Sequence, residues 1–285
     1  MPTDTDQDLR PLAFSIAYRM VGSVGDAEDI VQEAMLRLHG TEADSPRAFL
    51  STVVTRLSID HLRSARVRRE SYIGPWLPEP LLTDPEPGPE ERAETSDSLS
   101  QAFLVLLEQL SPVERAVFLL REVFGYQYEE IARVVERTPD NCRQLLVRAK
   151  RHVEDGRPRF DADRGKREEL ADRFLRAAAE GDTDALVSML AADAAAYGDG
   201  GGKVTAARKP IHGAARVAKF ITGLMRIGRR RGGYSVRPAW VNHQPGFVVL
   251  HESEGVDAVW ALDVAEGVIQ SIRIVRNPDK LGHVR

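Results

Sequence analysis

A proline-rich acidic stretch at residues 70–98 constrains the architecture of this chain more than any other feature. It contains six prolines and eight acidic residues, and proline both fixes φ and removes a backbone hydrogen-bond donor. Such a stretch cannot continue a helix or a central strand, so the 285 residues are expected to form separate domains around it. Its apolar side chains allow two interpretations, a partly collapsed loop or a segment docked on a neighbouring domain. They are Tyr72, Ile73, Trp76, Leu77, Leu81 and Leu82.

The residues before this linker show helical periodicity. Two helices are expected within residues 8–39, separated by a turn at Gly22–Gly25, with Asp26 as the N-cap of the second helix. A third helix, basic toward its end, is expected at 47–69. The second helix has an apolar stripe that leaves Asp29, Gln32, Glu33 and Arg37 on its exposed face, and the first three are the candidate partner-binding residues.

A helix-turn-helix is expected after the linker. Following helices at 98–110 and 112–124, residues 126–153 divide into a short helix, a turn at Glu136–Arg137 and a longer helix capped by Thr138. Arg can engage guanine and Asn or Gln can engage adenine in the major groove, so the longer helix favours DNA binding, with a charged solvent face as the alternative. Its candidate DNA-binding residues are Asn141, Arg143, Gln144, Arg148 and Arg151.

The last part of the chain has a different pattern. A charged hinge at 155–167 leads into helices at 167–180 and 182–191. Strands at 194–197 and 204–209 then flank the sequence DGGGKV, and a helix at 213–228 precedes the basic stretch Arg229–Arg231. We expect this stretch to be a solvated turn, with contact to DNA or to the acidic linker as the alternatives. The order of helices followed by a meander of strands predicts an α+β domain with a curved antiparallel sheet. The four alternating runs are 234–242, 246–252, 256–264 and 268–276.

The charged residues are segregated along the chain. The overall net charge of −4 hides uneven segments, among them −6 over residues 1–44, +5 over 45–69 and −7 over 70–98, which suggests basic surfaces for a polyanion separated by acidic segments. The single Cys142 is expected to be a small core residue in a reducing cytoplasm. Neither a metal site nor a cofactor is expected from the scattered histidines, and no apolar run is long enough to span a membrane.

Three stretches in the first 153 residues carry a family resemblance. FSIAYRMVGSVGDAEDIVQEAMLRLH, PRAFLSTVVTRLSIDHLRSAR and the helix-turn-helix together resemble an extracytoplasmic-function (ECF) RNA polymerase sigma factor. GPWLPEP, DGGGK and NPDKL match the subgroup of that family with a fused SnoaL-like extension. The resemblance implies a multidomain protein, with two all-α sigma domains followed by an α+β SnoaL-like cone. The implied division is 1–70 for sigma region 2, 71–98 for the linker, 99–154 for sigma region 4, 155–167 for the hinge and 168–285 for the SnoaL-like domain.

The resemblance also implies partners and roles. The exposed face of the second helix would bind the clamp helices of the largest polymerase subunit, and region 4 would meet the flap of the second-largest subunit and the −35 element. The third helix would melt and read the −10 element through Arg56, Asp60, Arg63 and Arg66, with Asp60 organising the arginines. The free protein is expected to be a monomer without a separate anti-sigma protein, because in this subgroup the extension is taken to control the sigma core in cis.

The sequence DGGGKV has three possible interpretations. A phosphate loop would need a helix directly after the glycines; a catalytic Asp199 would make the extension a SnoaL-like cyclase or isomerase tethered to DNA or polymerase; an interdomain contact would use the close backbone approach that glycine permits. We expect the third, with the Tyr72–Leu82 segment as the partner. The residues assigned to this contact are Asp199, Gly200, Gly201, Gly202, Lys203, Trp76, Asn277, Pro278, Asp279 and Lys280.

Overall fold

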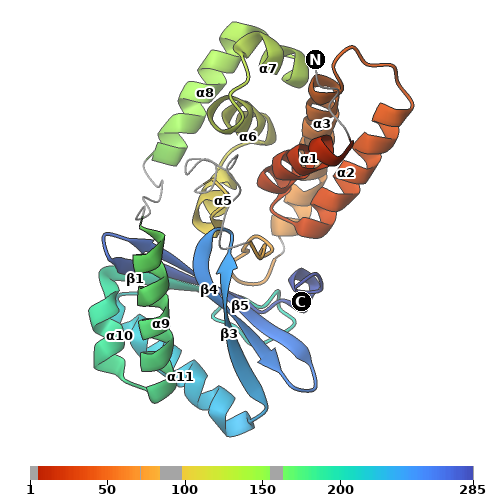
Figure 1. Cartoon of the computed structure of the whole chain (residues 1–285). Coiled ribbons are helices and arrows are strands. Elements are labelled where there is room, and N and C mark those ends of the chain that lie inside the picture. The colour runs from red at the N-terminus through yellow and green to blue at the C-terminus, as the bar shows by residue number, and fades with distance from the viewer. Residues whose placement is uncertain (1–5, 71, 84–97, 155–162, 285) are drawn as a thin grey trace. The chain divides into compact units, whose positions relative to one another are not determined.

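The computed structural model describes residues 6–70, 72–83, 98–154 and 163–284 (Figure 1). The chain forms two compact units, one of residues 1–71 with 104–157 and one of residues 72–103 with 158–285. Much of the predicted linker and of the predicted hinge lies outside the described residues. The described part of the linker, residues 72–83, belongs to the same unit as the C-terminal α+β domain.

The N-terminal part of the first unit consists of three helices: α1 (Asp6–Val21), α2 (Val24–His39) and α3 (Pro46–Glu70). The prediction of Asp26 as the N-cap of α2 is wrong. Ser23 caps this helix, because its side-chain oxygen accepts the backbone N–H of Asp26 at 3.1 Å. The helix thus begins before Gly25, and Asp26 contributes its charge to the first turn instead.

The second part of the first unit contains the predicted helix-turn-helix. Helix α5 (Gln101–Leu107) contains the boundary between the two units, and the elements that follow it are α6 (Pro112–Phe118), the π-helical turn η1 (Leu119–Val123), α7 (Tyr128–Val135) and α8 (Pro139–Glu154). Glu136 adopts a left-handed conformation with φ 55° and ends α7. Thr138 caps α8 by accepting the N–H of Asn141 at 3.2 Å, as predicted.

Polar contacts join the two parts of the first unit. Arg115 on α6 is buried, and its guanidinium donates to the carbonyl of Met20 at 2.6 Å and to Glu108 at 2.8 Å. Burial lowers the pKa of Arg115 to about 9, which leaves it charged at neutral pH. The hydroxyls of Ser51 on α3 and Tyr126 lie 2.6 Å apart. These contacts hold α1 and α3 against the helix-turn-helix.

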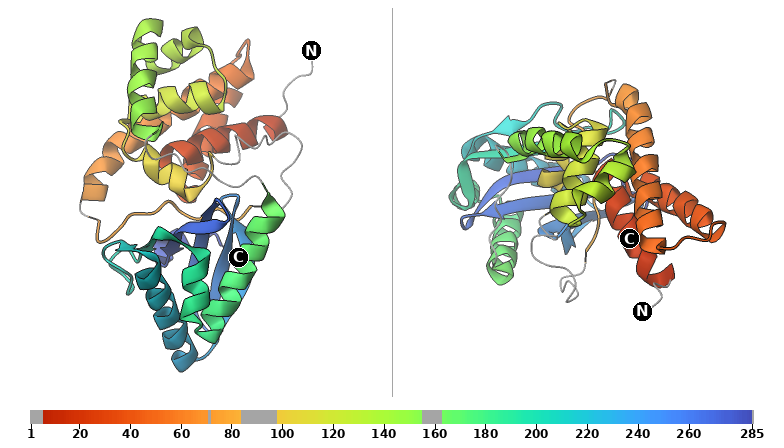
Figure 2. Two further views of the ribbon diagram at one scale, coloured as in Figure 1. Left: turned by 90° about the vertical axis from the view of Figure 1, so that its left-hand side faces the viewer. Right: turned by 90° about the horizontal axis from the view of Figure 1, so that it is seen from above.

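The second unit is the predicted α+β cone. Helices α9 (Arg164–Glu180), α10 (Thr183–Met189) and α11 (Ala214–Arg231) lie along one face of a six-stranded sheet (Figures 1 and 2). The core between these two layers contains Phe174, Leu186, Ile221, Trp260 and Ile272. The strands are β1 (Leu190–Asp199), β2 (Ile211–His212), β3 (Tyr234–Val241), β4 (Gln244–His251), β5 (Gly255–Ala265) and β6 (Val268–Val275), in the order β2-β1-β6-β5-β4-β3.

Two local predictions in this unit are wrong and one is confirmed. The strand expected at 204–209 is irregular, and the short antiparallel partner of β1 is β2. The four predicted runs form the antiparallel strands β3–β6, and β1 joins the same sheet parallel to β6. The arginines of Arg229–Arg231 form the last turn of α11 rather than a connecting turn, a position in which cations complement the helix dipole. The pattern along the chain indicated where strands lie but not which strands pair with each other.

Candidate functional surfaces

The exposed face of α2 carries the side chains that the sequence analysis assigned to polymerase. Asp29, Gln32 and Glu33 are all exposed, while the apolar stripe of the helix is buried. Glu33 pairs with Arg37 one turn later, at 2.9 Å. Leu36 lies on the same side and is 62% exposed, an apolar contribution to this face that the sequence analysis missed. The face can therefore offer both charge and an apolar contact to a partner.

Two of the four candidate −10 residues form an ion pair on α3, and a third contacts the helix-turn-helix. Asp60 pairs with Arg63 at 3.0 Å. The guanidinium of Arg56 donates to the carbonyls of Val134 and Arg133 at 2.9 and 2.8 Å, at the end of α7. Carbonyls at a helix C-terminus lack partners within the helix, so Arg56 satisfies them. The side chain of the fourth candidate, Arg66, lies outside the described residues.

The exposed face of α8 presents the candidate −35 residues. Arg143, Gln144, Arg148 and Arg151 are exposed and Asn141 is half-buried. Arg143 pairs with Asp140 at 2.5 Å and lies over the ring of Tyr128, which fixes the direction of its guanidinium. Cys142 faces the core, and burial raises the pKa of its thiol, as expected for a packing residue rather than a nucleophile.

The DGGGKV sequence forms a tight turn at the end of β1. The N–H groups of Lys203 and Val204 both donate to the carbonyl of Gly200, at 2.9 and 3.2 Å. The chain then continues irregularly to β2, and the next helix begins only at Ala214. This geometry lacks the helix N-terminus that a phosphate loop requires.

Asp199 is the centre of a buried polar cluster. Its carboxylate is 0% exposed and accepts hydrogen bonds from the hydroxyl of Tyr72 at 2.5 Å, the N–H of Leu77 at 2.9 Å and the N–H of Gly201 at 3.0 Å. A fourth partner is Lys280, whose Nζ lies 2.7 Å away. The four donors enclose both carboxylate oxygens, so a substrate cannot approach Asp199 in this arrangement. The carboxylate is thus used to hold the linker segment.

Lys280 binds the same linker segment from the other side. Its Nζ donates to the carbonyl of Leu77 at 2.5 Å, and it lies 4.3 Å from the ring centre of Trp76 and 4.9 Å from that of Tyr72. Burial and the hydrogen bond to Asp199 raise the pKa of Tyr72 above its ordinary value of 10.0. The phenol therefore remains a hydrogen-bond donor at neutral pH. Asn277 in turn donates to the Tyr72 oxygen at 2.9 Å.

The glycines allow this approach. Gly201 has φ 58°, and a Cβ there would overlap with the side-chain amide of Asn277. Gly202 has φ 74°, and a Cβ there would lie 2.8 Å from Cδ1 of Ile73 in the linker. Both positions thus require glycine for conformation and for space.

Lys203 does not join the buried cluster. It pairs with Asp279 at 2.6 Å on the surface, where the two side chains are 54% and 61% exposed. The sequence analysis assigned both Asp199 and Lys203 to the contact with the linker. The structure separates them, because Asp199 turns inward and takes Lys280 as its cation.

Asn242 binds Leu81 of the linker and Leu99, the residue directly after the linker, and the sequence analysis missed it. Its Oδ1 accepts the N–H of Leu81 at 3.0 Å, and its Nδ2 donates to the carbonyl of Leu99 at 3.0 Å. Asn242 is buried in the turn between β3 and β4, with φ 52°. A side-chain amide can accept and donate at once, so this single residue fixes two positions far apart in the chain. Asn is common in two-residue hairpin turns because of its backbone conformation, so the sequence did not indicate that its side chain also binds the linker.

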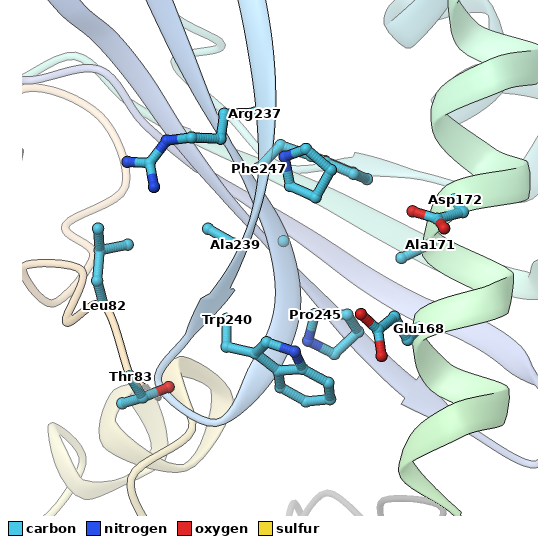
Figure 3. Close-up of a pocket in the computed structure, with 12 residues that line it drawn as sticks. Leu82, Thr83, Glu168, Ala171, Asp172, Arg237, Ala239, Trp240, Pro245 and Phe247 are labelled. Atoms are coloured by element: carbon cyan, nitrogen blue, oxygen red, sulfur yellow. The ribbon is translucent and has the colours of Figure 1, made fainter. Parts of the chain in front are cut away.

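The described part of the linker also covers the edge of the sheet. Thr83 donates its N–H to the carbonyl of Trp240 at 3.0 Å, which adds the linker to the edge strand β3. Leu82 and Thr83 form one side of a cavity of about 500 Å³. Figure 3 shows Glu168 on α9 on the opposite side of this cavity, and Trp240 also lines it.

Neither a membrane span nor a metal cluster is seen where the structure is described. No helix among the described residues is long and apolar enough to cross a lipid bilayer. In the same residues, no group of three or more His, Cys, Asp or Glu side chains is arranged to hold a metal ion.

Comparisons with known proteins match each part of the chain. A family model described as Sigma-70 region 2 matches residues 7–68, and one described as Sigma-70, region 4 matches residues 100–153. The first match contains the α2 and α3 surfaces, and the second contains the helix-turn-helix.

Similar proteins extend over nearly the whole chain. The ECF RNA polymerase sigma factor SigJ of Mycobacterium tuberculosis is 37% identical over 284 residues, which cover 95% of this chain and 90% of the relative. A probable ECF RNA polymerase sigma factor, SigI of the same species, is 31% identical over 97% of this chain and 93% of its own length. The crystal structure of SigJ matches with a TM-score of 0.77 and 35% identity, covering 96% of this chain and 95% of that one.

Proposed function

The chain belongs to the extracytoplasmic-function RNA polymerase sigma factors, and from this premise we propose that its SnoaL-like domain controls the sigma core in cis by holding the linker. A sigma factor binds core RNA polymerase and directs it to promoter DNA. The proposal adds how this chain sets the spacing of its two DNA-binding regions. The observation that carries it is the buried Asp199 carboxylate, which binds Tyr72 and Leu77 of the linker.

The physical argument rests on where the linker is held. The segment that follows α3 is bound at Asp199 and Lys280, and Asn242 binds both Leu81 and Leu99. A tether fixed at both ends cannot extend between the domains that it joins. The SnoaL-like domain thereby limits the separation that regions 2 and 4 can reach.

We assign the DNA and polymerase contacts within this scheme to exposed faces. The α8 residues Arg143, Gln144 and Arg148 read the −35 element, and the basic face of α3 acts at the −10 element. The α2 face around Asp29 and Glu33 binds the polymerase clamp helices. Control rather than chemical turnover is proposed for the C-terminal domain, since the carboxylate that a catalytic role would use is enclosed by linker donors.

Substitution of Gly201 tests the proposal. In Gly201→Val, the side chain overlaps with Asn277 and opens the Asp199 cluster, so we expect altered promoter-dependent transcription with purified core polymerase. Crosslinking between residues 72–83 and the C-terminal domain should fall in parallel. Gly267→Val is the matched control, because Gly267 also has positive φ, 72°, but a Cβ there meets nothing within 4 Å. Equal transcription and crosslinking by both variants would contradict the proposal.

A further inference from the structure

A second cavity in the SnoaL-like domain has the size of a small-molecule site. It has a volume of about 370 Å³ and lies between the C-terminal half of α11 and the core face of the sheet. Its lining includes neither Asp199 nor any linker residue. The cavity is therefore distinct from the polar cluster that holds the linker.

The walls of this cavity are apolar. Leu224 and Met225 of α11 face Val236 and Val249 of the sheet, and Trp260 contributes its ring. The first four side chains are only partly buried, although they pack against the core. Partly exposed apolar side chains around an open cavity provide a surface for the apolar body of a ligand.

The rim of the cavity is basic. Arg229, Arg231 and Arg276 line it against a single acid, Asp257, and Arg276 already pairs with Asp257 at 2.8 Å. No ion pair to Arg229 or Arg231 is seen among the described residues. Complementing the helix dipole does not explain this placement fully, because Arg230 occupies the same last turn without lining the cavity. An apolar interior with a basic rim fits a ligand that has an apolar chain and an anionic end.

Arg276 connects this cavity to the linker cluster. Its guanidinium binds Asp257 and also donates to the carbonyl of Thr205 at 2.7 Å, in the segment that follows DGGGKV. Its backbone N–H donates to the carbonyl of Asp199 at 2.7 Å. An anion that competes for the Arg276 guanidinium thus acts on a residue whose backbone is hydrogen-bonded to Asp199, and Asp199 holds the linker.

We propose that this cavity binds an amphipathic monocarboxylate, a fatty-acid-like molecule, and that its binding changes how firmly the Asp199 cluster holds the linker. The carboxylate pairs with the rim arginines and the hydrocarbon chain lies against Trp260 and the apolar walls. The binding site stands by itself, whereas its effect on the linker rests on the proposed function.

Calorimetric titration of the full-length protein tests the binding site. Decanoate is the probe, with decan-1-ol and decyltrimethylammonium as neutral and cationic probes of matched chain length, all below their micelle-forming concentrations. We expect decanoate to bind at least about tenfold more tightly than either, as charge-assisted hydrogen bonds predict. Similar affinity for the three probes, or no binding of decanoate, would overturn the proposal.

Variants locate the site. Arg229→Gln with Arg231→Gln should weaken decanoate binding roughly tenfold, while Arg230→Gln, from the same helical turn, should leave it unchanged. Val249→Trp fills the cavity and keeps every arginine, so it should abolish binding while the protein remains folded by circular dichroism. Equal weakening by Arg230→Gln would mean a non-specific basic surface and would overturn the assignment.

Hydrogen exchange of the Leu77 amide tests the connection to the linker. This N–H donates to Asp199, so its exchange rate reports whether the cluster is closed. We expect saturating decanoate to change that rate at least about threefold in the wild type and not in Val249→Trp. Unchanged exchange despite binding would overturn the connection alone. A failure of the Gly201→Val test, which uses no decanoate, would instead remove the proposed function and leave the binding site.

Discussion

At the scale of single residues, two ion pairs of similar length have different physical consequences. Asp199 and Lys280 lie 2.7 Å apart with side chains 0% and 8% exposed, whereas Lys203 and Asp279 lie 2.6 Å apart in solvent. Removing one partner of a buried pair leaves an uncompensated charge, which costs far more than the loss of a surface pair. The buried pair therefore stabilises the docked linker, and the surface pair contributes little.

Lys280→Met tests this difference directly. We expect it to destabilise the second unit by about 3–5 kcal/mol, because the Asp199 carboxylate remains buried without its cation. Lys203→Met removes a cation of the same type and should cost less than about 1 kcal/mol. Chemical denaturation measures both values, and Leu77 amide exchange should rise only in the first variant. Equal costs for the two substitutions would contradict the role of the buried cluster.

At the scale of secondary-structure elements, the exposed helical faces carry the side chains that we assign to polymerase and DNA. Helix α2 buries Ile30 and Ala34 and exposes Asp29 and Glu33, so substitutions on its outer face leave the core intact. The same separation of core and surface applies to α8, whose buried stripe includes Cys142 and Leu146. Each exposed face can therefore be tested without unfolding the domain.

Charge reversal on α2 should abolish binding to core polymerase. Asp29→Arg with Glu33→Arg places two cations on the face that we expect to meet basic clamp helices, and like charges repel. Co-purification with core polymerase measures the loss. Glu169→Arg with Glu180→Arg, two exposed acids of α9, is the control and should bind as wild type. Unchanged co-purification of the α2 variant would exclude this face.

Removal of two arginines from α3 should prevent promoter melting. Arg63→Ala with Arg66→Ala deletes cations that we assign to the −10 element, where the separated strands need stabilisation. The control is Arg173→Ala with Arg176→Ala, which has the same spacing on the exposed face of α9. Permanganate footprinting of promoter DNA reports strand separation. Normal melting by the α3 variant would contradict the assignment.

The elements also show what the sequence could predict. Apolar periodicity identified α2, α3, α8 and the strands β3–β6, since periodicity records which side of an element is buried. It could not pair β1 with β6 in parallel, because alternation does not identify a strand's neighbour. It could not find the role of Asn242 either, since the two partners of that side chain, Leu81 and Leu99, come from a distant segment.

The candidate site was predicted in part. The sequence indicated that DGGGKV would meet the Tyr72–Leu82 segment, and the described residues place Tyr72 and Leu77 on Asp199. The ion-pair partner of Asp199 was not predictable from the sequence. Lys203 lies nearer to Asp199 along the chain, but Lys280, which follows β6, forms the pair. Which of two lysines is buried depends on tertiary packing rather than on spacing along the chain.

At the scale of the whole molecule, we propose that the linker determines how far apart the DNA-binding regions can move. If residues 72–83 were released, that segment alone could span up to about 40 Å, whereas one base pair adds only about 3.4 Å to a promoter spacer. A docked linker should therefore make transcription depend sharply on the distance between the −35 and −10 elements. A released linker should tolerate many distances.

Transcription from a series of promoters that differ only in spacer length tests this claim most directly. With core polymerase and full-length protein, we expect a single optimum and a loss of about tenfold two base pairs away, with Lys203→Met behaving as wild type. Lys280→Met should flatten the profile to differences of less than about threefold, because the linker is free. An equally sharp profile from Lys280→Met, with its linker shown to be released by Leu77 amide exchange, would contradict control of promoter spacing by the C-terminal domain.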